Sequence, residues 1–344
     1  MACAEKLSTH LWSKLKDEST NETLSICVSQ DGAVFTGHDS KLNVWMRTQD
    51  DSKWNKTGTL ITPTKGDVNA ICEATTASRT LLIFSLDNCI LFYDRQNLTE
   101  HLHQVCHNKD EINQLSINAK GNLICACDDS GEIKLIDTSS YQVVKTLTAH
   151  DNICSTVKFI RRKPWEILSG GLDCKMIRWD FNRGRPLCSL NQNELSNSNF
   201  GSYAINPPMV HTLDVFPSTS MVVCGLGNGT VCVYAMKSGR DMELLCASEL
   251  HSASISCTCA IEISKSDSKI VEQFVVSGGD DRRLCVSKLV VRDGSKAGGK
   301  YNLELLSQIN HGSKINCLAL HRNCEQFLIF VVDLTCFVSV YICS

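Results

Sequence analysis

The sequence contains little proline, few aromatic residues, no long apolar run and no excess of one charge. Only 6 of its 344 residues are proline, and 6% are aromatic. The longest apolar run, Phe327 to Val332, is far shorter than the roughly 20 residues that a membrane-spanning helix needs. The formal net charge of −3 argues against a strongly basic nucleic-acid scaffold and against an acidic tail protein. Because 43% of the residues are hydrophobic, we expect a folded chain with no membrane anchor.

Cysteine is abundant, but the patterns that usually give cysteines a function are missing. The chain has 20 cysteines and no Cys-x-x-Cys pair, which is the usual half of a structural zinc site. Residues Met1 to Ser8 contain no apolar stretch that could act as an export signal. Disulfides persist mainly in oxidising compartments. We therefore expect an intracellular protein, cytoplasmic or nuclear, whose reduced cysteines fill the core as small apolar residues.

One unit recurs seven times along the chain. Each copy has an apolar strand, a second strand ending in a small residue, a tight Asp/Gly turn and a third strand, and the clearest copy runs from Ile167 to Asp180. The third strands close on Trp45, Tyr93, Ile136, Trp179, Tyr234, Ser287 and Tyr341. Their spacing suits propeller blades of roughly 40–45 residues with loop insertions. The pattern predicts a seven-bladed β-propeller.

The same repeat predicts how the ring closes and where it carries insertions. Alternating residues such as Glu132 to Ile136 indicate half-buried strands, so we expect an all-β single domain over residues 1–344. The seventh copy has only three strands before Ser344. Because a blade with an open edge would be a liability, we expect Lys6 to Trp12 to supply the missing strand. Polar loop insertions are expected near residues 188–208, 264–272 and 292–302.

This pattern resembles the WD-repeat β-propeller family over essentially the whole chain. The fourth copy alone has the full signature, with His150, Ser169, Asp173 and Trp179 at the family's spacing. The resemblance implies that these four residues form a hydrogen-bonded network within the blade, a structural role and not a catalytic one. No Gly-x-Ser-x-Gly elbow or isolated carboxylate pair occurs. We predict a non-enzymatic interaction scaffold with no cofactor.

A short histidine-rich segment is the one metal-like cluster in the sequence. His101, His103 and His107 share strand parity, and imidazole groups suit Zn²⁺. All three would come from a single exposed segment between the second and third copies, which favours a solvated strand. We predict no metal, with these three histidines as the alternative.

Basic residues are the best candidates for partner contacts. Arg161 and Arg162 precede Pro164 and Trp165 in a turn of the fourth copy, which suits an acidic loop of a partner or a phosphate backbone. The overall negative charge and the lack of a repeated aromatic platform argue against nucleic acid. We predict a protein partner for an otherwise monomeric chain.

Several segments resemble WD-repeat proteins that act as substrate receptors of cullin-4 ubiquitin ligases; these are residues 110–118, 128–134, 150–155, 170–173 and 184–187. The resemblance implies docking on damaged-DNA-binding protein 1 through Trp-Asp-x-Arg at the end of a third strand. Here Arg183 follows Trp179-Asp180 one place late, and Arg95 follows Tyr93-Asp94 one place early. We predict both arginines as adaptor contacts. The alternative is a reader of short peptides, modified or not, at the central channel.

Overall fold

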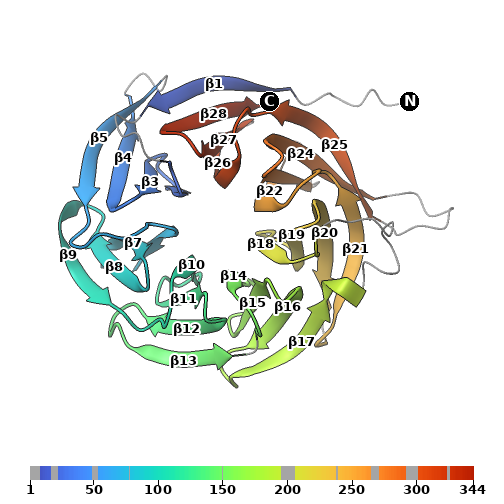
Figure 1. Cartoon of the computed structure of the whole chain (residues 1–344), viewed down its shortest axis with the longest axis horizontal. Helices are drawn as coiled ribbons and strands as arrows, with labels where there is room; N and C mark the ends of the chain where they lie inside the picture. Colours follow the sequence, from blue (N-terminus) through green and yellow to red (C-terminus); the bar gives the residue numbers. More distant parts are fainter. Residues whose placement is uncertain are drawn as a thin grey trace.

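The computed structural model describes residues 8–16, 22–48, 53–76, 78–148, 150–194, 206–237, 239–264, 271–291, 301–323 and 326–344. These residues form 28 strands and one helical turn at residues 192–194. No helix in this part of the chain is long and apolar enough to cross a membrane. The strands make seven four-stranded antiparallel sheets that stand as blades around a central axis (Figure 1).

The first three blades follow one another along the chain, each running from its innermost to its outermost strand. Blade one has β2 (Ser25–Val28), β3 (Val34–His38), β4 (Lys41–Arg47) and β5 (Trp54–Ile61). Blade two has β6 (Ile71–Thr75), β7 (Thr80–Leu86), β8 (Cys89–Asp94) and β9 (Asn97–Val105). Blade three has β10 (Ile112–Ile117), β11 (Leu123–Asp128), β12 (Glu132–Asp137) and β13 (Val143–Thr148).

The remaining four blades repeat this order. Blade four has β14 (Cys154–Phe159), β15 (Glu166–Gly171), β16 (Lys175–Asp180) and β17 (Arg185–Asn191). Blade five has β18 (Val210–Val215), β19 (Met221–Leu226), β20 (Thr230–Met236) and β21 (Met242–Glu249). Blade six has β22 (Ile255–Ser264), β23 (Val271–Gly279), β24 (Arg283–Val291) and β25 (Tyr301–Asn310). Blade seven has β26 (Ile315–Asn323), β27 (Gln326–Asp333), β28 (Phe337–Cys343) and β1 (Thr9–Lys16).

The predicted seven-bladed propeller is confirmed, and so is the way the ring closes. Strand β1 pairs antiparallel with β28, with Thr9 opposite Cys343. Beyond the strand ends, Ser8 and Ser344 exchange two backbone hydrogen bonds of 3.0 and 3.2 Å. Figure 1 shows β1 as the outermost strand beside β28. The N-terminal segment therefore completes blade seven and covers its open edge.

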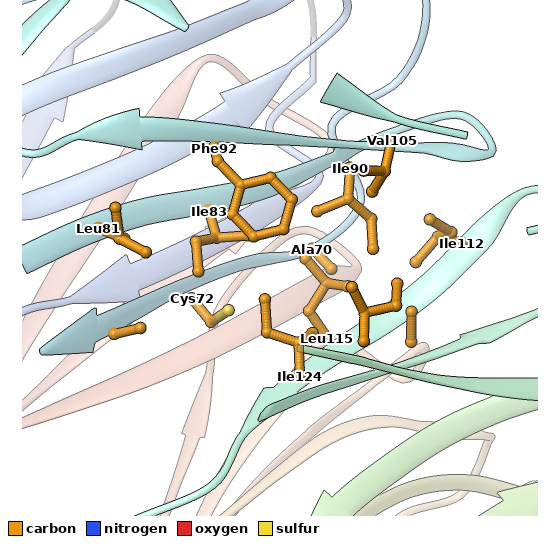
Figure 2. Close-up of a cluster of buried hydrophobic side chains, with 13 residues drawn as sticks. Ala70, Cys72, Leu81, Ile83, Ile90, Phe92, Val105, Ile112, Leu115 and Ile124 are labelled. Carbon is orange, nitrogen blue, oxygen red and sulfur yellow. The ribbon is translucent and has the colours of Figure 1, made fainter. Parts of the chain in front are cut away.

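The apolar core is divided into clusters that lie between neighbouring blades. In the cluster of Figure 2, Ile83 and Phe92 of blade two pack with Leu115 and Ile124 of blade three. Six further clusters join the other adjacent pairs, including Val34 of blade one with Phe330 of blade seven. Because each blade packs on both neighbours, burial of apolar surface holds the ring together blade by blade.

The predicted insertions differ from the structure at their ends. Cys188–Asn191 belong to strand β17, Ser264 ends β22, Val271 and Glu272 begin β23, and Tyr301 and Asn302 begin β25. The ladders therefore extend further than the polar composition suggests, since ladder hydrogen bonds can hold polar residues in an outer strand. The central parts of the three insertions, residues 195–205, 265–270 and 292–300, lie outside the described residues.

Candidate functional site

The four candidate arginines lie on one face of the ring. Neighbouring strands in every blade are antiparallel, so the turns after the first and third strands lie on the same side. We call this side the turn face. Arg161 and Arg162 lie in the turn between β14 and β15, Arg183 follows β16, and Arg95 follows β8. Topology thus gathers residues that are well separated in sequence onto one surface.

Arg95 is already occupied by internal partners. Its Nη2 lies 2.7 Å from Asp31 Oδ2, its Nε lies 2.5 Å from Glu73 Oε1, and its guanidinium lies 5.6 Å from the centre of the Phe35 ring. Burial raises the pKa of Asp31, but hydrogen bonds from Ser29 and the Ala33 amide, with the Arg95 contacts, lower that pKa overall. Burial raises the pKa of Glu73 and outweighs the attraction of Arg95. Arg95 therefore joins blade one to blade two.

The arginines of blade four are open to solvent. Arg161, Arg162, Arg183 and Arg185 are all exposed, and the side chain of Arg183 is 62% exposed. Only Arg183 has a carboxylate nearby, with its Nε 3.5 Å from Asp180 Oδ2. The other three have no ion-pair partner among the described residues. We name these four arginines and Trp165 the blade-four basic surface.

An internal ion pair keeps the surface basic. Glu166 lies next to Trp165, but its carboxylate accepts two hydrogen bonds from the buried Arg178, at 2.7 and 3.2 Å. Trp165 itself is 56% exposed and lies 6.0 Å from the ring of the buried Phe181. Since Glu166 is held from inside the blade, its charge is not available to neutralise the outer arginines. The turn face of blade four therefore presents several exposed guanidinium groups and an exposed aromatic ring, which suits an acidic protein segment.

The signature residues of blade four meet in one hydrogen-bonded chain. Trp179 Nε1 donates to Ser169 Oγ at 2.8 Å, and Ser169 Oγ lies 2.7 Å from His150 Nε2. His150 Nδ1 lies 3.0 Å from Asp173 Oδ1, so one tautomer satisfies every group. Burial raises the pKa of Asp173, but the bond from His150 is the largest of the effects that lower it overall. This hydrogen-bonded network ties the connection that precedes β14 to β15, to β16 and to the turn between them.

Two related networks occur in blades whose sequences lack the full signature. In blade six, His251 contacts Asp281 and Ser277, both at 2.9 Å. In blade seven, His311 contacts Asp333 and the Tyr341 hydroxyl, both at 2.7 Å. Sequence reasoning missed these networks because Ser287 and Tyr341 close the third strands where blade four has tryptophan. The available signal was a His before the first strand of each blade, with an Asp at the turn before the third strand, 30 residues later in blade six and 22 in blade seven.

The histidine-rich segment is not assembled as a metal site. His103 stacks on Tyr141 with ring centres 4.2 Å apart, and His107 Nε2 donates to the Tyr141 carbonyl at 3.1 Å. His101 faces Tyr93 instead. Among the described residues, no group of three or more His, Cys, Asp or Glu side chains could hold a metal ion. His103 and His107 therefore contact blade three, whereas His101 makes a ring contact within blade two.

The innermost strands leave a cavity of about 750 Å³ that opens at the turn face. Its lining carries charges of both signs that pair with each other, as Lys158 Nζ does with Asp214 Oδ1 at 3.5 Å. Arg161 lies at the same cavity, so the blade-four basic surface reaches the channel. A short peptide could enter here, but the paired charges favour no particular sign of ligand.

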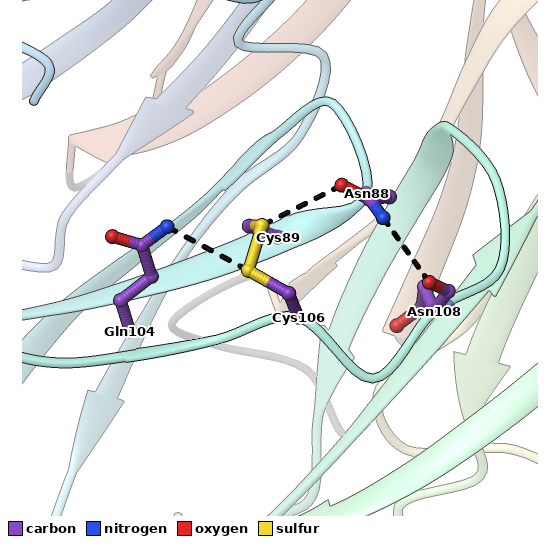
Figure 3. The surroundings of a disulfide bond; sticks show 5 residues. All are labelled: Asn88, Cys89, Gln104, Cys106 and Asn108. Carbon is purple, nitrogen blue, oxygen red and sulfur yellow. Dashed lines mark hydrogen bonds between the residues drawn. A yellow bond between two sulfur atoms is a disulfide. The ribbon is translucent and has the colours of Figure 1, made fainter. Parts of the chain in front are cut away.

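One cysteine pair corrects the expectation that all cysteines are reduced. Cys89 and Cys106 form a disulfide (Figure 3), whereas sixteen other described cysteines are free thiols. Most of the free thiols are buried, and burial raises the pKa of Cys27 to about 12 and places that of Cys125 well above its usual value. Such thiols remain protonated and inert. The core-filling interpretation therefore fits most of the cysteines, and the bonded pair is the exception.

Comparison with known proteins identifies the fold. The family model of the anaphase-promoting complex subunit 4 WD40 domain matches residues 76–162, from blade two into blade four. Among solved structures, the WD40 β-propeller domain of Doa1 superposes with a TM-score of 0.70 at 16% identity, covering 97% of this chain and 96% of that one. The chain therefore has the β-propeller fold of WD40 domains.

Two individual relatives have higher sequence identity than the fold match but cover less of the chain. The WD repeat-containing protein 53 homolog of Dictyostelium discoideum is 26% identical over 279 residues, 74% of each chain. This match confirms the resemblance to WD repeat-containing protein 53 that blades three and four suggest. The pre-rRNA-processing protein pro-1 of Caenorhabditis briggsae is 38% identical over 90 residues, which are 26% of this chain and 16% of that protein.

Proposed function

We propose that the protein is a non-enzymatic scaffold that docks an acidic partner on its blade-four basic surface. The observation that carries this proposal is the set of exposed arginines that share the turn face of blade four with Trp165; among the described residues, only Arg183 has a carboxylate partner, Asp180. Buried arginine and aromatic side chains dominate protein interfaces, and arginine forks bind carboxylates in pairs. The rigid ring fixes these side chains relative to one another, so little ordering is needed on binding.

Within this role, we propose that the chain is a substrate receptor of the cullin-4 ubiquitin ligase and binds damaged-DNA-binding protein 1. The support is the resemblance to WD repeat-containing protein 53 and the exposed Arg183 after Trp179-Asp180. Arg95 is held by Asp31 and Glu73, so the proposed contact rests on Arg183 alone. Such a ligase would place the protein in the cytoplasm or the nucleus.

The test is affinity purification of the intact protein from cells, read by quantitative mass spectrometry. We expect Arg183→Ala to deplete the co-purified adaptor roughly tenfold or more, the usual effect of truncating a central interface arginine. Arg240→Ala is the matched control, because Arg240 is exposed in the corresponding turn of blade five, between β20 and β21. If both variants retain the adaptor, Arg183 is not its contact; if wild type lacks it, the ligase proposal is wrong.

The channel supports a second candidate function, the reading of short peptides. The cavity of about 750 Å³ is large enough for a few side chains, and Lys158 and Asp214 could exchange their mutual pair for a ligand. Here Lys158→Met should abolish peptide capture while adaptor binding is unchanged. Loss of both activities in this variant would point to a damaged fold, which circular dichroism would reveal.

A further inference from the structure

The disulfide lies at an exposed end of the two outer strands of blade two, β8 and β9. In the β8–β9 ladder, Ile90 pairs with Val105, so Cys89 and Cys106 are the next opposed pair. Directly opposed residues bring their Cβ atoms close enough for a bond. Cys106 follows the last residue of β9 and is the one exposed cysteine in the described part of the chain. A small thiol can therefore reach its sulfur atom without unfolding the blade.

A second opposed pair shows what burial changes. Cys224 of β19 pairs directly with Cys232 of β20, yet both remain free thiols. Their exposed fractions are 0% and 1%, and burial raises the pKa of Cys232 to about 12. Because thiol–disulfide exchange needs a thiolate and access for the partner sulfur, this pair is shielded from it. Position in the blade therefore separates a reactive pair from an inert one.

We propose that Cys89–Cys106 is a reversible thiol–disulfide exchange site for small thiols of the glutathione class. The incoming thiolate attacks Cys106 Sγ and forms a mixed disulfide, the Cys89–Cys106 bond breaks, and Cys89 Sγ leaves with the electron pair and takes a proton from water. A second thiolate attacks the sulfur of the bound thiol and releases Cys106. In total, two small thiols are oxidised to their disulfide, and the two cysteines are reduced.

Neighbouring amide side chains can hydrogen-bond to the site in its oxidised and in its reduced form. Gln104 Nε2 lies 3.6 Å from Cys106 Sγ and donates to it (Figure 3). Asn88 Oδ1 lies 3.5 Å from Cys89 Sγ and is placed to accept a hydrogen bond from the Cys89 thiol once the disulfide opens. The reduced side chain therefore has a polar partner ready, and opening the bond leaves no buried group unsatisfied.

The site is linked to the crossing from blade two to blade three. Asn88 Nδ2 donates to the Asn108 carbonyl at 3.3 Å, and Asn108 Nδ2 donates to the buried Asp128 Oδ2 at 2.9 Å. The Lys109 amide donates to the same carboxylate oxygen at 3.3 Å. The disulfide lies two residues before this anchored stretch. Opening it should loosen the crossing while the sheets remain folded.

The test is differential alkylation of the folded protein across a series of glutathione redox buffers, read by peptide mass spectrometry. We expect Cys89 and Cys106 to be protected under oxidising conditions and labelled together under reducing ones. Cys224 and Cys232 should stay unlabelled in both, which makes them the internal control. Cys3 and Cys324 lie outside the described residues and are scored as separate peptides.

A second measurement separates exchange from unfolding. Hydrogen exchange of the peptide that contains Asn108 and Lys109 should speed up on reduction, while peptides of blade five should be unaffected. The Cys89→Ser/Cys106→Ser variant should exchange at the reduced rate in every buffer. Labelling of the pair in fully oxidised protein, or labelling that appears only in denaturant, would overturn the proposal.

Discussion

Blade four and blade two are four-stranded sheets of the same topology, yet different interactions stabilise them. In blade four, the hydrogen-bonded network from Trp179 through Ser169 and His150 to Asp173 is buried and uses none of the arginines of the blade-four basic surface. In blade two, an exposed disulfide joins the outer strands, and Arg95 is used up in ion pairs. The comparison teaches that the arginines on the turn face of blade four can contact a partner, because the internal network does not use them. In blade two, by contrast, Arg95 is engaged in ion pairs that join blades one and two.

The largest expected effect tests the network of blade four. Ser169→Ala removes the partner of both Trp179 Nε1 and His150 Nε2, and leaving two buried groups unsatisfied should cost about 3 kcal/mol. Ser85 is equally buried in β7 of blade two and accepts one hydrogen bond, from the Ala70 amide, so Ser85→Ala should cost about 1 kcal/mol. Urea unfolding gives both values. Equal losses would remove the distinction between the two blades.

The next effect concerns the disulfide of blade two. The loop between Cys89 and Cys106 spans 17 residues, so the oxidised form should be more stable than the reduced form by about 3 kcal/mol. The difference is measured by urea unfolding with and without a dithiol reductant. It should vanish in Cys89→Ser/Cys106→Ser but persist in Cys224→Ser, because Cys224 is a free thiol. A reductant effect that survives in the double variant would assign the stabilisation to other cysteines.

A pH series tests the carboxylate of the blade-four network. The folded-state pKa of Asp173 is below its usual value, so its ionised form stabilises the fold, and this stabilisation is lost as pH falls below about 4. Asp281 and Asp333 have pKa values lowered in the same direction. Unfolding midpoints should therefore drop between pH 5 and 3, and less steeply in Asp173→Asn. An identical slope in the variant would show that this carboxylate does not contribute.

The smallest expected effect is on the free energy of unfolding of an Asp67 variant, and it is not a loss of stability. Burial, together with Asp39 and Asp87, raises the pKa of Asp67, which precedes blade two, so its charge opposes folding at neutral pH. Asp67→Asn should leave stability unchanged or raise it by about 0.5 kcal/mol or less at pH 7, since the site is near the surface. Thermal unfolding at pH 7 provides the measurement. A clear loss of stability would mean that the Asp67 carboxylate has a favourable contact.

The sequence predicts the fold well because the seven copies share a period, and the closing strand follows from the incomplete seventh copy. It also predicts the hydrogen-bonded network of blade four, because the four residues of that network lie within one repeat unit. Arg95 could not be judged from sequence, since Asp31 comes from another blade. The disulfide was missed because its register depends on two bulges in β9, although two cysteines flanking one strand pair were a usable signal.

The pairing of β1 with β28 has a consequence for the order of folding. Thr9 and Cys343 are 334 positions apart, so this ladder has the greatest sequence separation in the described structure. A chain emerging from the ribosome releases β1 long before β28, and β1 lacks its β28 partner during that time. Closing so long a loop is also slow because its entropy must be lost before any contact is gained. Blade seven should therefore be the last to form, and a chain stalled before β28 would expose two unpaired strand edges to its neighbours.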